Sequence, residues 1–221
     1  MIVAEHLGKK YPTRAGPPHW VLRDVNFTIP PRLNVGILGR NGVGKSTLLR
    51  IIGGTDEPSE GQLRRSTNVS WPVGFGGGLL GSLTGRQNAK FLCRIQGRER
   101  DSAELLEKMQ DFAEIGPAFD EPVKTYSTGM RARLQFAMSL SFDFDVYISD
   151  EVTSVGDASF QKKALSHFKS LVGKASLIMA SHSEGALMDF CQAGIWINDG
   201  HAHWHDRIDD AIAAYRAAER G

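Results

Sequence analysis

The chain has 221 residues, of which 41% are hydrophobic, and its formal net charge is +1. This length supports one sizeable α/β core, with or without an inserted lobe, and leaves no room for a second full domain. The near-zero net charge provides no overall basic field of the kind that nucleic-acid-binding proteins use, so we expect no nucleic-acid partner.

An antiparallel sheet region is predicted at the start of the chain. Residues 2–6 and 20–29 have short alternating apolar patterns, and the turn-rich residues 12–18 separate them. Tyr11 lies between these strands, and its ring could stack on an adenine base, since every base has a π-face. A tyrosine that merely closes the hairpin is the equally supported alternative.

A phosphate-binding loop follows at residues 39–47, which fit the pattern G-x-x-x-x-G-K-[ST]. The apolar residues 35–38 before it predict a buried strand, and residues 48–52 after it predict a helix. A glycine-rich turn with a solvated lysine is the alternative, and it does not explain this strand and helix context. The candidate nucleotide-binding residues of the loop are Gly39, Asn41, Gly42, Gly44, Lys45, Ser46 and Thr47.

The residue types of the loop indicate its chemistry. The glycines permit backbone conformations that are closed to side chains, so that successive N–H groups point at phosphate oxygens near a helix N-terminus. Lys45 supplies a mobile cation for the β- and γ-phosphates, and the Ser46 hydroxyl is placed to ligate Mg²⁺.

Two short strands, around residues 62–65 and 69–71, precede a glycine cluster at residues 74–81. We interpret the cluster as a flexible connector in preference to a loop that moves when nucleotide or a partner binds. An all-helical lobe is predicted next. A capping box at residues 84–87 begins one helix, and a second helix covers residues 102–115, with Gly116 just past its end.

Residues 126–131, Tyr-Ser-Thr-Gly-Met-Arg, begin a further helix that carries apolar residues as far as Phe142. Ser127 suits an N-cap, and together with Gly129 it would present hydroxyl and backbone donors at a helix N-terminus, which is a second anion site. Many helices begin with serine and a nearby glycine, so this pattern alone does not establish a site.

Two acids end the next predicted strand, residues 142–151. Asp150 can hold the Mg²⁺ shell, directly or through water, and Glu151 can polarise the water that attacks a γ-phosphate. A charged pair that only caps the strand is the alternative. A helix ended by Gly173 leads to a strand that finishes at His182, where a histidine can donate a hydrogen bond to the γ-phosphate or be purely structural.

The last segment contains His201, His203 and His205 at alternating positions, which would share one face of a strand at metal-ligand spacing. We favour an exposed hairpin strand, because no acidic or thiol ligand accompanies them. Residues 208–215 predict a short closing helix.

The two cysteines, Cys93 and Cys191, lie far apart without C-x-x-C or zinc-site spacing, which fits a reducing compartment. Charged residues occur too close to the N-terminus for the apolar core of a signal peptide. No run of about 18 apolar residues, as a membrane span requires, is present. We therefore expect any membrane role to come through a partner.

Together these motifs resemble the ATP-binding cassette (ABC) ATPases. The phosphate loop, the signature at residues 126–130, the acidic pair, the Ser-Val-Gly-Asp loop at residues 154–157 and the histidine occur in that family's order over essentially the whole chain. The resemblance implies an α/β P-loop NTPase with a mostly parallel sheet core, an antiparallel β subdomain and an inserted helical subdomain.

The same resemblance implies a single nucleotide-binding domain, residues 1–221. Its expected parts are an antiparallel β region (about 1–33), a catalytic core (34–83 and 136–221) and a helical signature subdomain (84–135).

The resemblance also implies a homodimer that sandwiches two ATP molecules with Mg²⁺. Lys45 and Ser46 of one copy, with Ser127 and Gly129 of the other, would bind each ATP. Stacking by Tyr11, γ-phosphate contact by His182 and hydrolysis assisted by Glu151 would complete each site.

Residues 70–88, 124–134 and 150–157 resemble more closely the ATPase subunit of bacterial capsular polysaccharide exporters. This implies a translocase that lies peripherally on the cytoplasmic face of the bacterial inner membrane and moves polysaccharide through integral membrane permease subunits, of which two are expected. Related O-antigen and teichoic acid subunits often carry an extra C-terminal domain, for which the chain to Gly221 leaves no room.

An exporter ATPase for O-antigen or teichoic acid is the alternative, followed by an ABC ATPase without a transport role. Balanced charge and a single cassette without a coiled-coil insertion weigh against the latter. A kinase with the same phosphate loop would not explain the signature at Ser127 and Gly129.

The chain departs from the family pattern at two places. The glutamine that usually follows the strand near Val69 has no counterpart, since residues 73–78 take its place and Gln87 lies too far along. The signature contains Thr128 and Met130 where glycine and glutamine are commoner.

Overall fold

The computed structural model describes residues 1–13, 16–74, 78–150, 157–171 and 173–220. The chain divides into two compact units, and neither unit is a continuous segment. Residues 1–72, 144–151 and 171–221 belong to the first unit, whereas residues 73–143 and 152–170 belong to the second.

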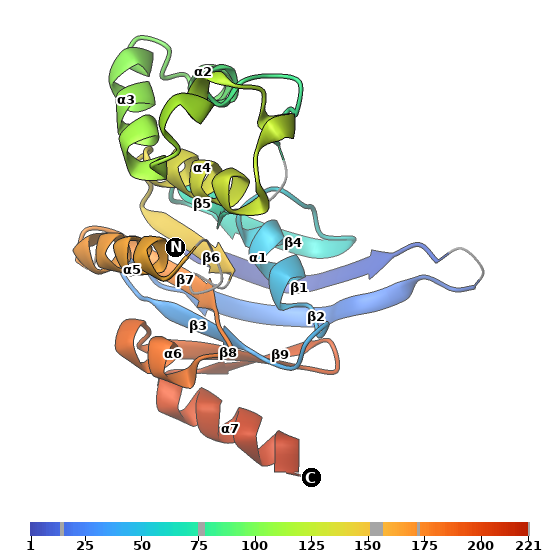
Figure 1. The fold of residues 1–221 in the computed structure, drawn as a ribbon. Coiled ribbons are helices and arrows are strands. Elements are labelled where there is room, and N and C mark those ends of the chain that lie inside the picture. Colours follow the sequence, from blue (N-terminus) through green and yellow to red (C-terminus); the bar gives the residue numbers. More distant parts are fainter. Residues whose placement is uncertain (14–15, 75–77, 151–156, 172, 221) are drawn as a thin grey trace. The chain divides into compact units, whose positions relative to one another are not determined.

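The first unit begins with the antiparallel sheet that the alternating patterns predict. β1 (Ile2–Tyr11) pairs with both β2 (His19–Ile29) and β4 (Glu60–Arg65), giving the strand order β2-β1-β4. Register shifts interrupt both ladders, and the β1–β2 ladder ends where Tyr11 is matched with His19. The three strands are labelled β1, β2 and β4 in Figure 1.

A second, six-stranded sheet has the order β5-β6-β7-β3-β8-β9. β3 pairs in parallel with β7 and β8, β6 pairs in parallel with β7, and β9 is antiparallel to β8. The mostly parallel core is therefore confirmed, as is the hairpin strand of the three histidines. The strands are β3 (Val35–Leu38), β5 (Val69–Val73), β6 (Val146–Asp150), β7 (Ser176–Ala180), β8 (Ala193–Asn198) and β9 (His201–His205).

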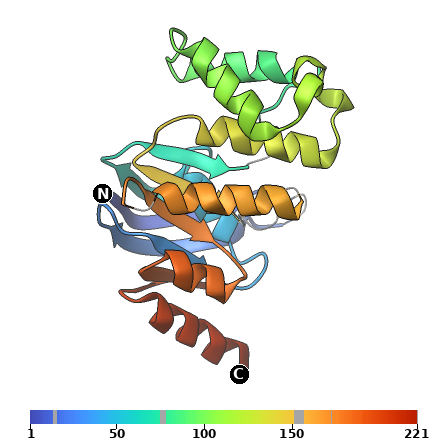
Figure 2. The same ribbon diagram turned by 60° about the vertical axis from the view of Figure 1, so that its left-hand side comes forward.

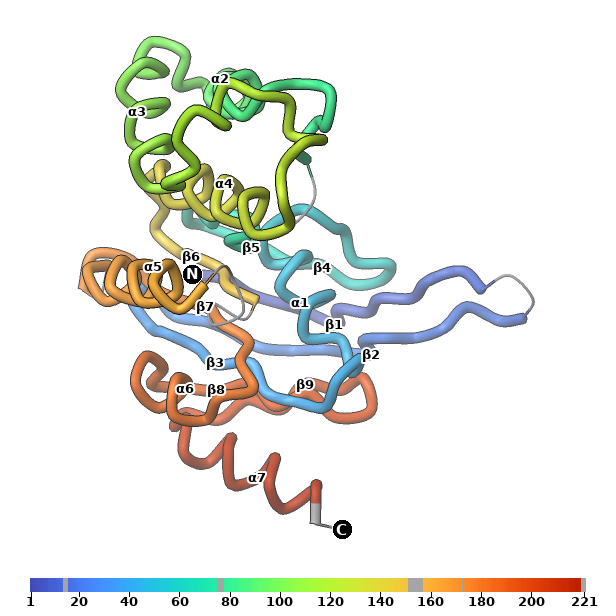
Figure 3. The backbone as a smooth tube through the Cα atoms, in the orientation of Figure 1, coloured from blue at the N-terminus to red at the C-terminus, as the bar shows by residue number. Residues whose placement is uncertain are grey.

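Helices pack on both faces of β3, whose four residues are all buried. Val35 and Ile37 belong to the hydrophobic core that also contains Leu48 and Leu49 of α1 (Lys45–Ile52). On the other face, a Cβ atom on Gly36 would lie 2.8 Å from Ile208 Cδ1 and 3.0 Å from a Leu187 methyl group. The absence of a side chain at Gly36 therefore allows two C-terminal helices to pack closely against β3. These helices are α6 (Glu184–Phe190) and α7 (Ile208–Arg220); Figure 3 traces the chain through both.

The second unit is helical. The predicted capping box is confirmed, because Thr84 Oγ1 accepts from the Gln87 N–H while the Gln87 side chain accepts from the Thr84 N–H. Its helices are α2 (Gly85–Ile95), α3 (Ser102–Ala113), α4 (Thr128–Leu140) and α5 (Ala158–Leu171), with short 3-10 helices at Gly116–Asp120 and Val123–Thr125. The green and yellow-green helices of Figure 2 are α2, α3 and α4.

Aromatic rings join three of these helices. Phe112 of α3 and Phe136 of α4 stack with centroids 6.3 Å apart, and Phe160 of α5 meets both edge-on at 5.8 and 5.7 Å. Such pairs add to the stabilisation that comes from burying their surface. Helix α4, which follows the signature, therefore packs against both α3 and α5.

Two predicted helix ends were wrong. Glu114, not Gly116, forms the left-handed C-cap of α3, with a φ of 51°. Its carboxylate accepts from Lys163 Nζ at 2.6 Å, and this ion pair helps to hold the unfavourable backbone conformation. Phe142 lies beyond α4, because Ser141 is the C-cap and its hydroxyl donates to the Ala137 carbonyl at 2.8 Å.

No helix in the part of the chain that the structure describes is long and apolar enough to cross a membrane.

Candidate functional site

The phosphate loop connects the end of β3 to α1 and requires glycine at defined positions. Gly39, Gly42 and Gly44 have φ values of 148°, 77° and 116°. A Cβ atom on Gly39 would lie 2.6 Å from the Ile197 carbonyl oxygen, and one on Gly44 would lie 2.9 Å from Val21 Cγ1. Backbone conformation and close packing therefore both exclude larger residues at Gly39 and Gly44, whereas at Gly42 only the backbone conformation does.

Lys45 is folded against this loop. Its side chain is buried, and its ammonium group donates to the Gly39 carbonyl at 2.7 Å and to the Arg40 carbonyl at 3.1 Å. Charged phosphate oxygens are stronger acceptors for an ammonium group than neutral carbonyls are. The lysine is thus already placed at the loop where a phosphate would receive its hydrogen bonds.

A depression of about 540 Å³ opens beside the loop. It brings together predicted residues from three places in the sequence, because β6 and β7 are neighbours and end at the same edge of the sheet. Two oxygen donors, the Ser46 hydroxyl and the Asp150 carboxylate, share it, and oxygen donors suit Mg²⁺. The predicted residues that line it are Asn41, Gly42, Gly44, Lys45, Ser46, Thr47, Asp150 and His182.

His19 and Val21 of β2 also line this depression, and no pattern in the sequence predicts this. Tyr11 is not among the lining residues, although it is the register partner of His19. Its hydroxyl donates to Asp56 Oδ2 at 2.8 Å. Tyr11 is therefore paired with a lining residue without lining the depression itself, and its stacking on a base stays a prediction.

Several predicted features lie outside the described residues. These are Glu151, the Ser-Val-Gly part of the loop at residues 154–157, and residues 75–77 of the predicted connector. For the three histidines of β9, the alternative of a metal site gains no support, since no group of His, Cys, Asp or Glu side chains in the described ranges is arranged to hold a metal ion.

Ser127 and Gly129 line a second depression, of about 660 Å³, within the helical unit. Ser127 is the N-cap of α4, as predicted, and its Oγ accepts from the Met130 N–H at 3.2 Å. Arg133, one turn further along α4, lines the same depression. This helix N-terminus thus combines a hydroxyl and backbone donors, which favour an anion, while the Glu114 and Asp157 carboxylates that also line the depression pair with the Arg133 guanidinium group.

Asp157 fixes the position of that guanidinium group. Arg133 donates to Asp157 Oδ2 at 2.7 Å, and its other nitrogen lies 3.5 Å from a Glu114 oxygen. Hydrogen bonds from the Ser159 hydroxyl and the Phe160 N–H, together with Arg133, lower the pKa of Asp157 to about 2. The carboxylate is consequently ionised at every physiological pH.

Comparison with known proteins decides the family. Residues 22–154 match the family model of the ABC transporter. This chain belongs to the ABC transporter family. Its fold is similar to a dimeric post-hydrolysis structure of the ATP-binding cassette MJ0796 bound to ADP and Pi, with a TM-score of 0.78, 20% identity, and coverage of 94% of this chain and 99% of that chain. The predicted ABC ATPase fold of the α/β class is confirmed.

Two relatives of this ABC cassette confirm the closer resemblance. The polysialic acid transport ATP-binding protein KpsT of Escherichia coli is 45% identical over 217 residues, which cover 98% of this chain and 99% of that protein. The capsule polysaccharide export ATP-binding protein CtrD of Neisseria meningitidis serogroup B is 41% identical over 219 residues, which cover 98% and 99%.

Proposed function

We propose that this ABC cassette hydrolyses ATP to drive the export of a capsular polysaccharide across the cytoplasmic membrane. The main support for ATPase activity is that residues of the phosphate loop line the same depression as Asp150 and His182. Support for the cargo comes from near-complete alignment with KpsT and CtrD, which are named for polysialic acid transport and capsule polysaccharide export.

ATP binding would begin at the loop. Its N–H groups and the Lys45 ammonium receive the β- and γ-phosphates, so that Lys45 exchanges the Gly39 and Arg40 carbonyls for phosphate oxygens. Ser46 and Asp150 would hold Mg²⁺, which when bound neutralises phosphate charge.

Hydrolysis would use residues at the strand ends. Glu151 would accept a proton from water as the water oxygen bonds to the γ-phosphorus and the bond to the ADP oxygen breaks. His182 would donate a hydrogen bond to the γ-phosphate, where negative charge is concentrated.

A second copy would complete each site. Ser127 and Gly129 of that copy would donate to the γ-phosphate from the N-terminus of α4, so that ATP holds two copies together. We propose that this homodimer lies peripherally on the cytoplasmic face of the inner membrane, where it moves integral permease subunits, two being expected. The predicted subdomains, with residues 84–135 as the helical signature subdomain, belong to the same proposal.

Glu151→Gln tests this function, because an amide keeps the shape of the side chain but cannot accept the proton. We expect ATP to bind normally and turnover to fall by about 10²- to 10⁴-fold. Cells whose only copy carries the substitution should accumulate glycan inside the cytoplasmic membrane and lack it on the surface. Glu107→Gln, at an exposed position on α3, is the matched control and should change neither result.

Two outcomes would contradict different parts of the proposal. Near-normal turnover of Glu151→Gln would remove Glu151 from the catalytic role. If ATP turnover is lost but surface glycan is unchanged, the proposal that the cargo is a capsular polysaccharide is refuted. The proposed ATPase activity is not affected by that result.

A further inference from the structure

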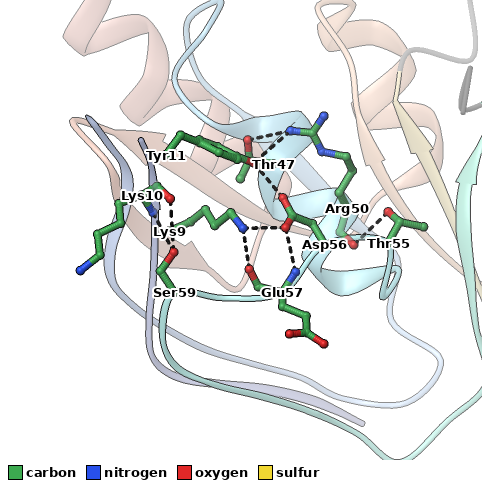
Figure 4. Close-up of polar contacts among 9 residues, drawn as sticks. All are labelled: Lys9, Lys10, Tyr11, Thr47, Arg50, Thr55, Asp56, Glu57 and Ser59. Carbon is green, nitrogen blue, oxygen red and sulfur yellow. Dashed lines mark hydrogen bonds and ion pairs between the residues drawn. The ribbon is translucent and has the colours of Figure 1, made fainter. Parts of the chain in front are cut away.

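A network of polar side chains ties Tyr11 to the helix that follows the phosphate loop (Figure 4). The Tyr11 hydroxyl donates to Asp56 Oδ2 at 2.8 Å and accepts from Arg50 Nη2 at 3.3 Å. The same Arg50 nitrogen donates to Thr47 Oγ1 at 3.2 Å, and Thr47 lines the nucleotide depression. Arg50 therefore links the ring of Tyr11 to the wall of the nucleotide site.

Asp56 is itself held in place. The Lys9 ammonium donates to Asp56 Oδ1 at 2.6 Å and to the Glu57 carbonyl at 2.7 Å, and the Glu57 N–H donates to Asp56 Oδ1 at 2.8 Å. The Lys9 side chain is 11% exposed and that of Asp56 is 23% exposed, so the ion pair is largely shielded from water. Burial works to raise the pKa of Asp56, but the hydrogen bonds from Lys9 and Tyr11 outweigh it and lower that pKa.

The ring of Tyr11 is consequently fixed through its hydroxyl, opposite a residue that lines the depression. Its register partner across the hairpin, His19, lines the depression, and the Lys9 ammonium lies 4.9 Å from the ring centroid. A tyrosine that only closes a hairpin needs no such anchoring of its hydroxyl. A ring that is already immobilised loses less conformational entropy when a ligand packs against it.

We propose that Asp56 and Arg50 are positioning residues for the base of the nucleotide. They hold the Tyr11 ring in the orientation in which the adenine stacks on it. This inference rests on the proposed function, since it requires ATP in the depression.

Calorimetric titration of the full chain with two ligands tests the inference. ATP has a base and three phosphates, whereas inorganic tripolyphosphate has the phosphates alone. Removal of the ring in Tyr11→Ala should weaken ATP binding about 5- to 150-fold, the range of base–aromatic stacking. Tyr11→Phe and Asp56→Asn keep the aromatic ring but weaken the hydrogen bonding that fixes its orientation. Each should weaken ATP binding about 2- to 12-fold. Tripolyphosphate affinity should not change in any of the three variants.

Glu57→Gln is the matched control, because it removes a carboxylate one residue away that points out of the network in Figure 4. It should bind both ligands as the unsubstituted chain does. An equal loss of affinity for ATP and tripolyphosphate in Asp56→Asn would show that the network supports the phosphate loop, and would overturn the inference.

Wild-type ATP affinity in both Tyr11→Phe and Asp56→Asn would also overturn it, even if Tyr11→Ala were weakened. These failures leave ATP binding by the unsubstituted chain intact. Failure of the unsubstituted chain to bind ATP would instead refute the proposed function, so the two failures are distinguishable.

Discussion

Through its side chain, Asn34 joins the start of β3 to β7 and to the end of α6. It directly precedes β3, and its side chain is buried. Its Oδ1 accepts from the Leu177 N–H at 2.8 Å, and its Nδ2 donates to the Phe190 carbonyl at 2.8 Å. Replacement of Asn34 by alanine removes both hydrogen bonds while leaving the backbone in place.

The expected loss of stability follows from the two groups left behind. In Asn34→Ala the Leu177 N–H and the Phe190 carbonyl stay buried without these partners, at about 1–3 kcal/mol each. The free energy of unfolding should therefore fall by about 2–6 kcal/mol, which is a large fraction of the roughly 5–15 kcal/mol typical of native proteins.

Urea denaturation measures this difference. The four tryptophans and the far-ultraviolet circular dichroism supply two probes, whose coincident transitions would establish two-state unfolding. Gln192→Ala is the control, because its Oε1 accepts from the Asn34 N–H at 3.0 Å at an exposed residue where water can replace it. The control should lose less than about 1 kcal/mol. An equally small loss in Asn34→Ala would refute the reasoning.

Three further outcomes are expected. Burial raises the pKa of the Cys191 thiol to about 12, so iodoacetamide at pH 8 should label it only after unfolding; rapid labelling of the native chain would contradict this. Asp157 has its pKa lowered from 3.8 to about 2, so its stabilising effect is complete above pH 3.8 and disappears as the pH falls through 2. In thermal melts, the melting temperature of Asp157→Asn should therefore fall less between pH 3.8 and pH 2 than that of the unsubstituted chain. An identical dependence of melting temperature on pH in both chains would contradict this role of Asp157. Gly44→Ala places a Cβ atom 2.9 Å from Val21 Cγ1 at a φ of 116°, so its ATP affinity by calorimetry should fall at least about tenfold, and a near-normal affinity would show that the loop can relax.

Features that depend on neighbouring residues were predictable from the sequence. The N-caps at Thr84 and Ser127 are confirmed, because a capping hydroxyl and its N–H partner are separated by only three residues. The phosphate-loop strand and helix are confirmed for the same reason, since both patterns adjoin the glycines.

Features that depend on distant residues were not predictable. His19 enters the nucleotide depression because β1 and β2 pair with three register shifts, and the alternating pattern does not specify those shifts. The anchoring of Tyr11 by Asp56 joins residues 45 apart in the chain. Helix α6 has only seven residues, which is too short for a helical period to be recognised.

The central position of β3 has a consequence for how the chain is synthesised. Both of its partners, β7 and β8, come from the last fifth of the sequence, roughly 140 residues or more after β3. At the usual rate of roughly 5–20 residues per second, both edges of this apolar strand stay unpaired for about 7–30 s during synthesis. A chain released before Ser176 has the entire phosphate-loop motif but lacks both strands that pair with β3. Premature termination should therefore yield a substrate for chaperones and proteases rather than a partly active ATPase.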